Sequence, residues 1–134
     1  MQSDRGSFVK NREVLILRSF KDIPEPLSSF LIYAESIQGK SQKTIDEYFY
    51  DLRTFYRFIK VRYGLVDSSV DFNKIEIDDV TIEHLAAVDL NFIYEYINYL
   101  NRERSNASSA RARKVASLKS FYKYLLSFFY FIFF

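Results

Sequence analysis

The chain has 134 residues, of which 49% are hydrophobic, so it has the size of one domain and enough apolar material for one core. Its 19 basic and 17 acidic side chains give a net charge of +2, so an electrostatic partner has to be inferred from where the charges lie. The absence of cysteine excludes thiol nucleophiles, disulfides and Cys-based zinc sites, and three glycines exclude a phosphate-binding loop. With His84 as the single histidine, we expect no metal site and no cofactor.

Residues 1–23 are predicted to form an N-terminal arm. Asp4 and Arg5 lie where a secretory signal peptide needs an apolar run, so no signal peptide is expected and the predicted location is cytoplasmic. A short apolar patch follows at residues 14–17, and basic side chains flank it. A strand, one turn of helix and a mobile arm all fit this patch.

Residues 24–126 are predicted to fold as one helical domain, whose first helix lies between Pro24 and Gly39. Apolar residues recur there at helical spacing, with prolines ahead of them and the glycine placed to end the helix. These apolar residues are Leu27, Phe30, Leu31, Ala34 and Ile37.

The second helix has the clearest pattern in the chain and ends before Gly64. Its apolar residues keep the three-four rhythm of a helix. They are Ile45, Tyr48, Phe49, Leu52, Phe55, Tyr56 and Ile59. Two starts are open, because Ser41 can cap the helix directly and Thr44 with Glu47 can form a capping box.

After this helix the pattern predicts a loop at residues 65–79, a short helix that follows Thr81, and a third long helix that Asp89 caps. A linker at residues 105–109 ends in the cap of the last helix. The apolar stripes of the two later helices are Phe92, Ile93, Tyr96, Ile97 and Leu100, and Val115, Leu118, Phe121, Tyr122 and Leu125. Four main helices with such stripes and short connections predict an all-α fold, a compact helical bundle.

Residues 127–134 are predicted to be an aromatic tail outside this domain. From residue 128 onward the tail is almost all aromatic and has no polar face, which fits neither an amphipathic helix nor a surface strand. Lys123 interrupts the apolar run before it, and the run falls short of the roughly 18 residues that span a bilayer. We therefore expect no membrane contact.

Charge is distributed unevenly along the chain. Residues 1–64 carry a net charge of +3, residues 65–100 carry −7 and residues 101–123 carry +6. The last helix and its approach are therefore a basic segment that can attract an anion such as a phosphate backbone.

The last helix combines this charge with small side chains. At 100° per residue, the side opposite its apolar stripe holds Ser109, Arg113, Ser117 and Ser120. Arg111 starts nearer the core, but its long stem can reach past the helix end. Backbone N–H groups, hydroxyls and arginines in the first turns suit phosphate oxygens, and three alanines allow close approach to a DNA groove.

The same geometry makes a second outward set on the second helix. Its members are Lys43, Glu47, Tyr50, Thr54 and Arg57. A solvated helix face with an ordinary cap explains such residues equally well, so spacing alone leaves nucleic-acid contact and a plain surface both open. An enzyme is disfavoured, because most of the 11 tyrosines lie on apolar stripes and no pair of carboxylates forms an acid–base couple.

Two stretches together resemble the signature helices of the N-terminal, core-binding domain of tyrosine recombinases, the phage integrase and Xer group. The stretches read Ser41-x-x-Thr44-Ile45-x-x-Tyr48-x-x-Asp51-Leu52-x-x-Phe55-x-x-Phe58-Ile59 and Ser109-x-x-x-Arg113-Lys114-Val115-Ala116-Ser117-Leu118-Lys119-Ser120-Phe121-Tyr122-Lys123-Tyr124-Leu125. Between them, residues 79–81 and the apolar residues up to Leu100 resemble the middle of that domain. The resemblance covers residues 27–126.

This resemblance implies a four-helix, SAM-like bundle that binds one face of a recombination site in double-stranded DNA. Carried over position by position, it implies DNA contacts for Ser41, Lys43 and Thr44 on the second helix, and for Arg111, Arg113, Lys114 and Ser117 on the last one. The arginine, lysine, His-x-x-Arg and nucleophilic tyrosine of the family's catalytic domain have no counterpart, since Ala87 follows three residues after His84. Strand cleavage is therefore not expected, and the aromatic tail indicates a truncated or frame-shifted product.

Two functions follow as hypotheses. The first is a DNA-binding module that docks its second and last helices on a duplex, mainly through phosphates. The second is a protein-interaction module that associates with full-length recombinase subunits or another partner. The first requires that Lys43 and Arg113 face the same side and are not engaged with acidic neighbours.

Overall fold

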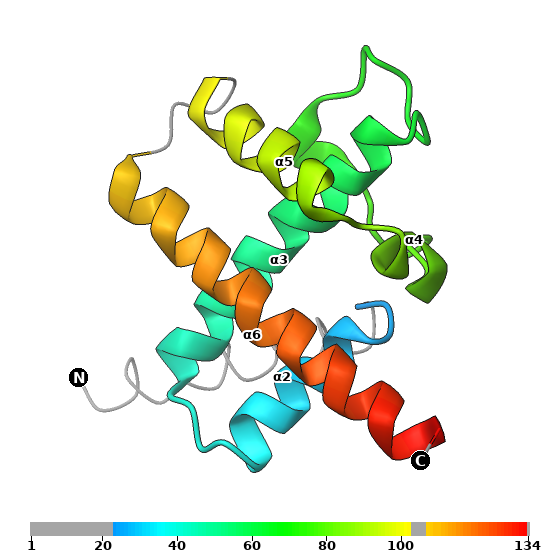
Figure 1. Ribbon diagram of the computed structural model, residues 1–134. Helices are drawn as coiled ribbons and strands as arrows, with labels where there is room; N and C mark the ends of the chain where they lie inside the picture. The colour runs from blue at the N-terminus through cyan, green and yellow to red at the C-terminus, as the bar shows by residue number, and fades with distance from the viewer. Residues whose placement is uncertain (1–22, 103–106, 134) are drawn as a thin grey trace, which may run out of the picture.

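The computed structural model describes residues 23–102 and 107–133, with side chains as far as residue 127. These residues form five α-helices and one 3-10 helix and contain no strand, which confirms the all-α fold (Figure 1). The helices are α2 (Leu27–Ser36), α3 (Gln42–Arg62), η1 (Phe72–Lys74), α4 (Ile82–Ala86), α5 (Leu90–Arg102) and α6 (Ser108–Phe133). Four of them are the predicted long helices, and α4 is the predicted short one.

Helix α3 begins and ends as its sequence dictates. The Ser41 hydroxyl accepts a hydrogen bond from the Thr44 backbone N–H at 3.2 Å, so Ser41 is the cap rather than the alternative pair of Thr44 and Glu47. At the other end Gly64 has a φ of 66°, and the Leu65 N–H bonds back to the Lys60 carbonyl at 2.8 Å. This left-handed turn favours glycine and ends the helix.

The core is built from aromatic rings that α2, α3, α5 and α6 contribute. Phe30 of α2 lies 5.3 Å from Phe121 of α6, ring centre to ring centre, in an edge-on arrangement. Phe55 of α3 packs in the same way against Tyr96 of α5 at 5.0 Å. All four side chains are at most 1% exposed. Such edge-to-face pairs fix the angles between helices as well as burying area.

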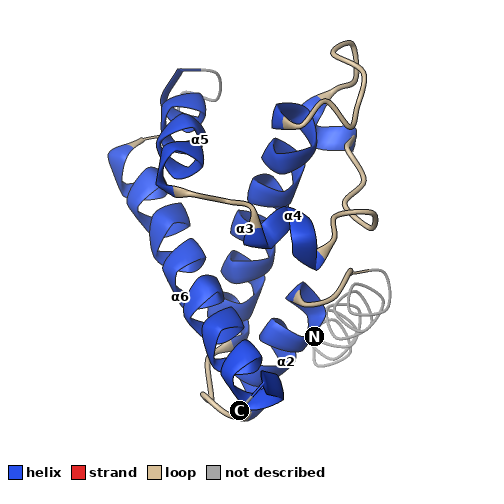
Figure 2. Ribbon diagram, turned by 45° about the vertical axis from the view of Figure 1, so that its right-hand side comes forward, coloured by secondary structure: helices blue, strands red, loops and turns tan. Residues whose placement is uncertain are grey.

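Helix α3 is buried on almost all sides in its second half, which its apolar stripe did not predict. Thr54, expected to face outward, is buried, and its hydroxyl donates to the Tyr50 carbonyl at 3.0 Å. Arg57, also expected outward, is half-buried and donates from Nε to the Ile75 carbonyl at 3.0 Å. For Arg57 the reason is that the connection from α3 to α4 runs back along α3 (Figure 2) and accepts its hydrogen bond.

Lys60 attaches the same connection to α3. Its side chain is only 7% exposed, and its Nζ lies 2.7 Å from the Glu76 carbonyl and 2.7 Å from the Asp79 carboxylate. The hydrogen bond from Lys60 holds the pKa of Asp79 below its usual range. The buried ammonium of Lys60 is therefore compensated by two oxygen atoms of the connection.

The Lys60–Asp79 pair predicts an acid-dependent loss of stability. Because the folded-state pKa of Asp79 is depressed, its contribution is complete above the unfolded value of about 3.9 and is lost as pH falls through the folded value. The Asp79 side chain is 58% exposed, so we expect Asp79→Asn to cost at most about 1 kcal/mol at neutral pH. Urea unfolding of both proteins from pH 7 to pH 3 should show the difference narrowing as pH falls; a constant difference would contradict this assignment.

The short helix α4 and helix α5 begin at the predicted caps. Thr81 and His84 form a reciprocal cap, in which His84 Nδ1 accepts from the Thr81 N–H at 3.0 Å. The Asp89 carboxylate accepts from the Phe92 N–H at 2.8 Å and starts α5. The single histidine of the chain thus serves as a helix cap.

Helix α6 is longer than predicted. Its backbone stays helical to Phe133, so α6 continues into the segment that was predicted to be an aromatic tail outside the helical domain. Ile23, assigned to the N-terminal arm, is buried in the core, while residues 1–22 lie outside the described part. Within the part that the structure describes, we find no helix with the length and apolar character needed to cross a membrane.

Candidate nucleic-acid interface

The exposed side of α6 is basic and lined with small residues. Between Ser108 and Ser127 this helix carries five basic side chains and no acidic one, namely Arg111, Arg113, Lys114, Lys119 and Lys123. At spacings of three or four residues its outer side presents Ser109, Ala112, Arg113, Ala116, Lys119 and Lys123, and all six are exposed. We call this set the α6 basic face. Small side chains between cations let a helix approach a polyanion closely.

Ser117 does not belong to the α6 basic face, so its predicted outward position is wrong. It is 2% exposed, and its hydroxyl donates to Oδ2 of Asp51 at 2.7 Å. The buried side of α6 is centred on Leu118, Phe121 and Leu125 rather than extending to Val115, which is only half-buried. The helix is thereby turned so that Ser117 faces α3.

Asp51 joins the two candidate helices. Its side chain is 1% exposed, and Arg113 donates to it from Nε at 3.2 Å and from Nη2 at 2.9 Å. Lys114 Nζ lies 3.9 Å from the same carboxylate. The hydrogen bond to Asp51 raises the pKa of Arg113 above its ordinary value. A buried carboxylate with two forked N–H bonds and one hydroxyl bond is fully compensated.

Arg113 therefore fails the condition that it has no acidic neighbour, and the expectation that it is a free cation is wrong; a DNA-binding role has to be carried by the exposed cations of α3 and α6 together. Its side chain is nevertheless 46% exposed. A guanidinium has five N–H donors, and the two bonds to Asp51 use two of them. Arg113 is anchored to α3 by one edge and presents the rest of its guanidinium at the protein surface.

The other two nominated cations of α6 make internal contacts. Arg111 is half-buried and donates to Asn101 at 3.1 Å and to Ser108 at 3.2 Å, which ties the start of α6 to the end of α5. The Lys114 side chain is 12% exposed and faces Asp51. Both therefore contribute to the fold, and Arg113 is the nominated α6 cation with the largest exposed part.

The start of α3 keeps an exposed cation. Lys43 is exposed and Thr44 half-buried, while the exposed Ser41 is already used as the cap. Lys43, Glu47 and Asp51 are four residues apart, so they follow one side of α3, over about 12 Å between the first and the last. Asp51 bonds Arg113, and the charge of Glu47 also acts on Arg113.

This side of α3 therefore faces the first half of α6. Figure 1 shows the two helices crossing, with their N-terminal ends on the same side of the crossing. Lys43 is exposed near the N-terminal end of α3, and a shared DNA-facing side for Lys43 and the α6 basic face stays a prediction.

Sequence reasoning missed Asp51 and Lys119. A lone carboxylate inside the run from Tyr48 to Phe55 signals a buried ionic partner, and Arg113 with Ser117 have the spacing of one helical turn to meet it. Lys119 lies six residues after Arg113, and it falls on the exposed side only once α6 is turned toward α3. The pairing of Asp51 and the exposure of Lys119 both depend on the angle at which α6 packs against α3.

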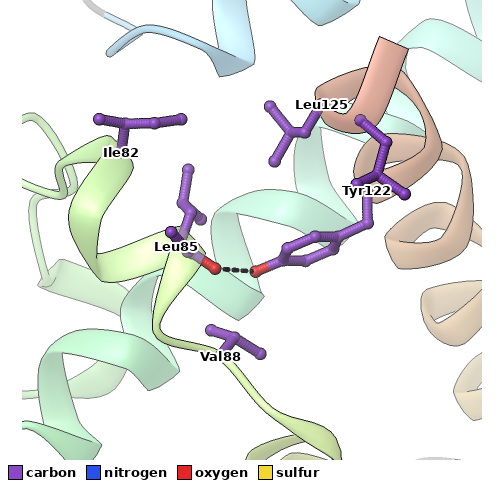
Figure 3. Close-up of a pocket in the computed structure, with 7 residues that line it drawn as sticks. Ile82, Leu85, Val88, Tyr122 and Leu125 are labelled. Atoms are coloured by element: carbon purple, nitrogen blue, oxygen red, sulfur yellow. Dashed lines mark hydrogen bonds between the residues drawn. The ribbon is translucent and has the colours of Figure 1, made fainter. Parts of the chain in front are cut away.

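A small apolar groove lies between α4 and α6 (Figure 3). It encloses about 270 Å³ and is lined by Ile82, Leu85, Ala86, Val88, Tyr122, Leu125 and Leu126. The Tyr122 hydroxyl donates to the Leu85 carbonyl at 2.9 Å, so its polar atom is already used. No cluster of three His, Cys, Asp or Glu side chains that could hold a metal occurs in residues 23–102 and 107–133. The groove offers an apolar surface without polar groups to orient a cofactor.

Comparison with known proteins places the chain beside the tyrosine recombinases, which confirms the resemblance drawn from its two signature helices. It is 44% identical over 117 residues to the tyrosine recombinase XerC of Caldanaerobacter subterraneus subsp. tengcongensis, over 87% of this chain and 33% of that protein. It is 34% identical to the XerC of Chlorobaculum tepidum and 30% identical to that of Lacticaseibacillus casei, each over 75% of this chain.

The chain spans about a quarter to a third of the length of these relatives: 33% of the Caldanaerobacter protein, 26% of the Chlorobaculum protein and 28% of the Lacticaseibacillus protein. No family model matches it, and no solved structure gives a significant match. The similarity therefore relates this chain to one portion of an Xer-type recombinase.

Proposed function

We propose that this chain is a duplex-DNA-binding module of the tyrosine recombinase type. The α6 basic face and the start of α3, with Ser41, Lys43 and Thr44, lie against the phosphates of one face of the duplex. The α6 basic face carries the proposal, because it combines three exposed cations with two alanines and no acidic side chain. Similarity to recombinases named XerC supports DNA as the polyanion.

The roles of the nominated residues differ in this proposal. Lys43 and Arg113 contact phosphates directly, and Lys119 and Lys123 extend the contact along α6. Arg111 and Lys114 add positive charge near the surface while they hold α6 in place. Ser117, being buried, supports the site from inside and makes no contact with DNA.

The module binds DNA without cutting it. In the sequence of these 134 residues His84 is the only histidine, and its Nδ1 is occupied as an acceptor in the cap of α4. Tyr56 and Tyr122 are largely buried, and burial raises the pKa of both phenols, which opposes the phenolate that a nucleophile needs. In this proposal, DNA cleavage by the relatives depends on residues in the part of their sequences to which this chain does not align.

Titration with a mixed-sequence duplex at several salt concentrations tests the proposal. If about four phosphates are neutralised, the logarithm of the association constant should fall with the logarithm of salt at a slope of about −3.6, roughly a hundredfold between 50 and 200 mM. Lys43→Ala and Lys119→Ala should each weaken binding and reduce the slope by about 1. Fluorescence anisotropy gives both values.

Lys74→Ala is the matched control, because it removes the same charge from the exposed 3-10 helix between α3 and α4. It should leave both the affinity and the slope nearly unchanged. A loss equal to that of Lys119→Ala would indicate nonspecific attraction by total charge. Absence of any salt-dependent binding would refute the proposal.

A second candidate function is contact with another protein chain. The apolar groove between α4 and α6 favours it, since Leu126 at its edge is 71% exposed. Sedimentation of the same sample separates the two functions. A monomer that binds DNA with the expected slope supports the first, whereas self-association without DNA binding supports the second.

A further inference from the structure

We propose that Asp51 is a positioning residue, which holds the Arg113 guanidinium so that its unused N–H donors face a DNA phosphate. This inference rests on the proposed DNA-binding function and adds the way in which one contact is oriented. Asp51 is 1% exposed and makes no contact with DNA itself.

The hydrogen bonds determine which edge of the guanidinium is available. Nε and Nη2 of Arg113 donate to the two oxygens of Asp51, which uses the lateral edge of the fork. The end-on edge, with one N–H on Nη2 and two on Nη1, remains for another acceptor. Two parallel N–H groups match two oxygens of a phosphate, so one planar group can bridge the buried carboxylate and the DNA backbone.

Asp51 is itself held firmly enough to act as an anchor. Its Oδ2 also accepts from the buried Ser117 hydroxyl at 2.7 Å, and Lys114 Nζ lies 3.9 Å from Oδ1. The carboxylate thus joins α3 to three residues within one turn of α6. An arginine fixed in this way loses less side-chain freedom when it binds a phosphate than a mobile surface arginine does.

A purely electrostatic role and a positioning role of Asp51 predict opposite changes in DNA affinity when its charge is removed. Asp51→Asn raises the net charge of the chain by one, so attraction between charges alone predicts tighter binding to DNA. Loss of the anchored orientation predicts weaker binding instead. The sign of the change therefore separates a positioning role from a purely electrostatic one.

The closing experiment compares the full chain with Asp51→Asn and Glu47→Gln by anisotropy on one duplex. Glu47→Gln makes the same change in charge beside Arg113, but it leaves the bonds between Arg113 and Asp51 intact. We expect Glu47→Gln to bind up to about threefold more tightly and Asp51→Asn to bind at least about fivefold more weakly than the unaltered chain. Circular dichroism and thermal unfolding verify that each protein is folded at the temperature of the titration.

Arg113→Lys keeps the charge but replaces the fork by a single ammonium, and it provides the test if Asp51→Asn does not fold. It should bind at least about fivefold more weakly, whereas Lys43→Arg should change affinity less than about twofold. Binding by folded Asp51→Asn as tight as that of Glu47→Gln, or unchanged binding by Arg113→Lys, overturns the positioning role while the DNA-binding function stands. If the unaltered chain binds no duplex, both proposals fall.

Discussion

Replacing Phe121 by alanine is expected to lower the free energy of unfolding by about 3–5 kcal/mol, the largest change that we predict for a single apolar substitution. The Phe121 side chain is 0% exposed. Its ring centre lies 5.3 Å from that of Phe30 and 6.1 Å from that of Tyr56, so it joins α6 to both α2 and α3. Its removal leaves a cavity at the point where three helices meet, and rigid aromatic neighbours cannot fill it.

Leu126→Ala provides the matched control on the same helix, because Leu126 is 71% exposed. It should cost less than about 0.5 kcal/mol. Urea unfolding followed by far-ultraviolet circular dichroism measures both values, and the midpoint temperature should fall by roughly 4–8 °C for each kcal/mol lost. Comparable losses in the two variants would show that Phe121 is not the junction described here.

The start of α3 illustrates what sequence can predict. A polar cap, an apolar stripe and a terminal glycine are local signals, and they placed the helix correctly between Ser41 and Gly64. The same holds for Thr81 and Asp89, which begin α4 and α5. Local signals work here because each cap bonds a backbone N–H only three residues away.

The angle at which α6 faces its neighbours was not predictable in the same way. Periodicity defines an apolar stripe broad enough to fit several rotations of the helix, and the polar partners of α3 select one of them. Asp51 and Ser117 are 66 residues apart in sequence, and their contact brings Ser117 inside. Similarly, the contact of Arg57 depends on a loop that only the tertiary structure places against α3.

The basic character of α6 could be predicted from the sequence, but the contacts of its individual residues differ from those expected. Lys43 is exposed as predicted, whereas Arg113 is 46% exposed but paired with Asp51. Arg111 and Lys114 carry the expected charge, yet their side chains are engaged within the fold. A count of basic residues cannot distinguish a cation that faces solvent from one that neutralises a buried carboxylate.

Asp51→Ala is expected to lower the free energy of unfolding by about 2–3 kcal/mol. The substitution leaves the buried Ser117 hydroxyl without its acceptor and removes the carboxylate that lies 3.9 Å from the 12% exposed Lys114 ammonium. This loss of unfolding free energy is smaller than the loss on breaking a fully buried ion pair, because Arg113 is 46% exposed and water can solvate its freed donors. Glu47 lies on the same helix, eight residues before Phe55, and is not bonded to Arg113. Glu47→Ala should therefore lower the free energy of unfolding by less than about 1 kcal/mol.

A double-mutant cycle with Arg113→Ala isolates the pair from the rest of the cluster. If Asp51 and Arg113 stabilise the contact between α3 and α6 together, the two losses should be less than additive, with a coupling energy of about 1 kcal/mol or more. The coupling should persist in high salt, since the carboxylate is only 1% exposed and its partners shield it from counterions. Additive losses, or coupling that disappears with salt, would mean that Arg113 is an ordinary surface cation and that its pairing with Asp51 does not hold α6 to α3.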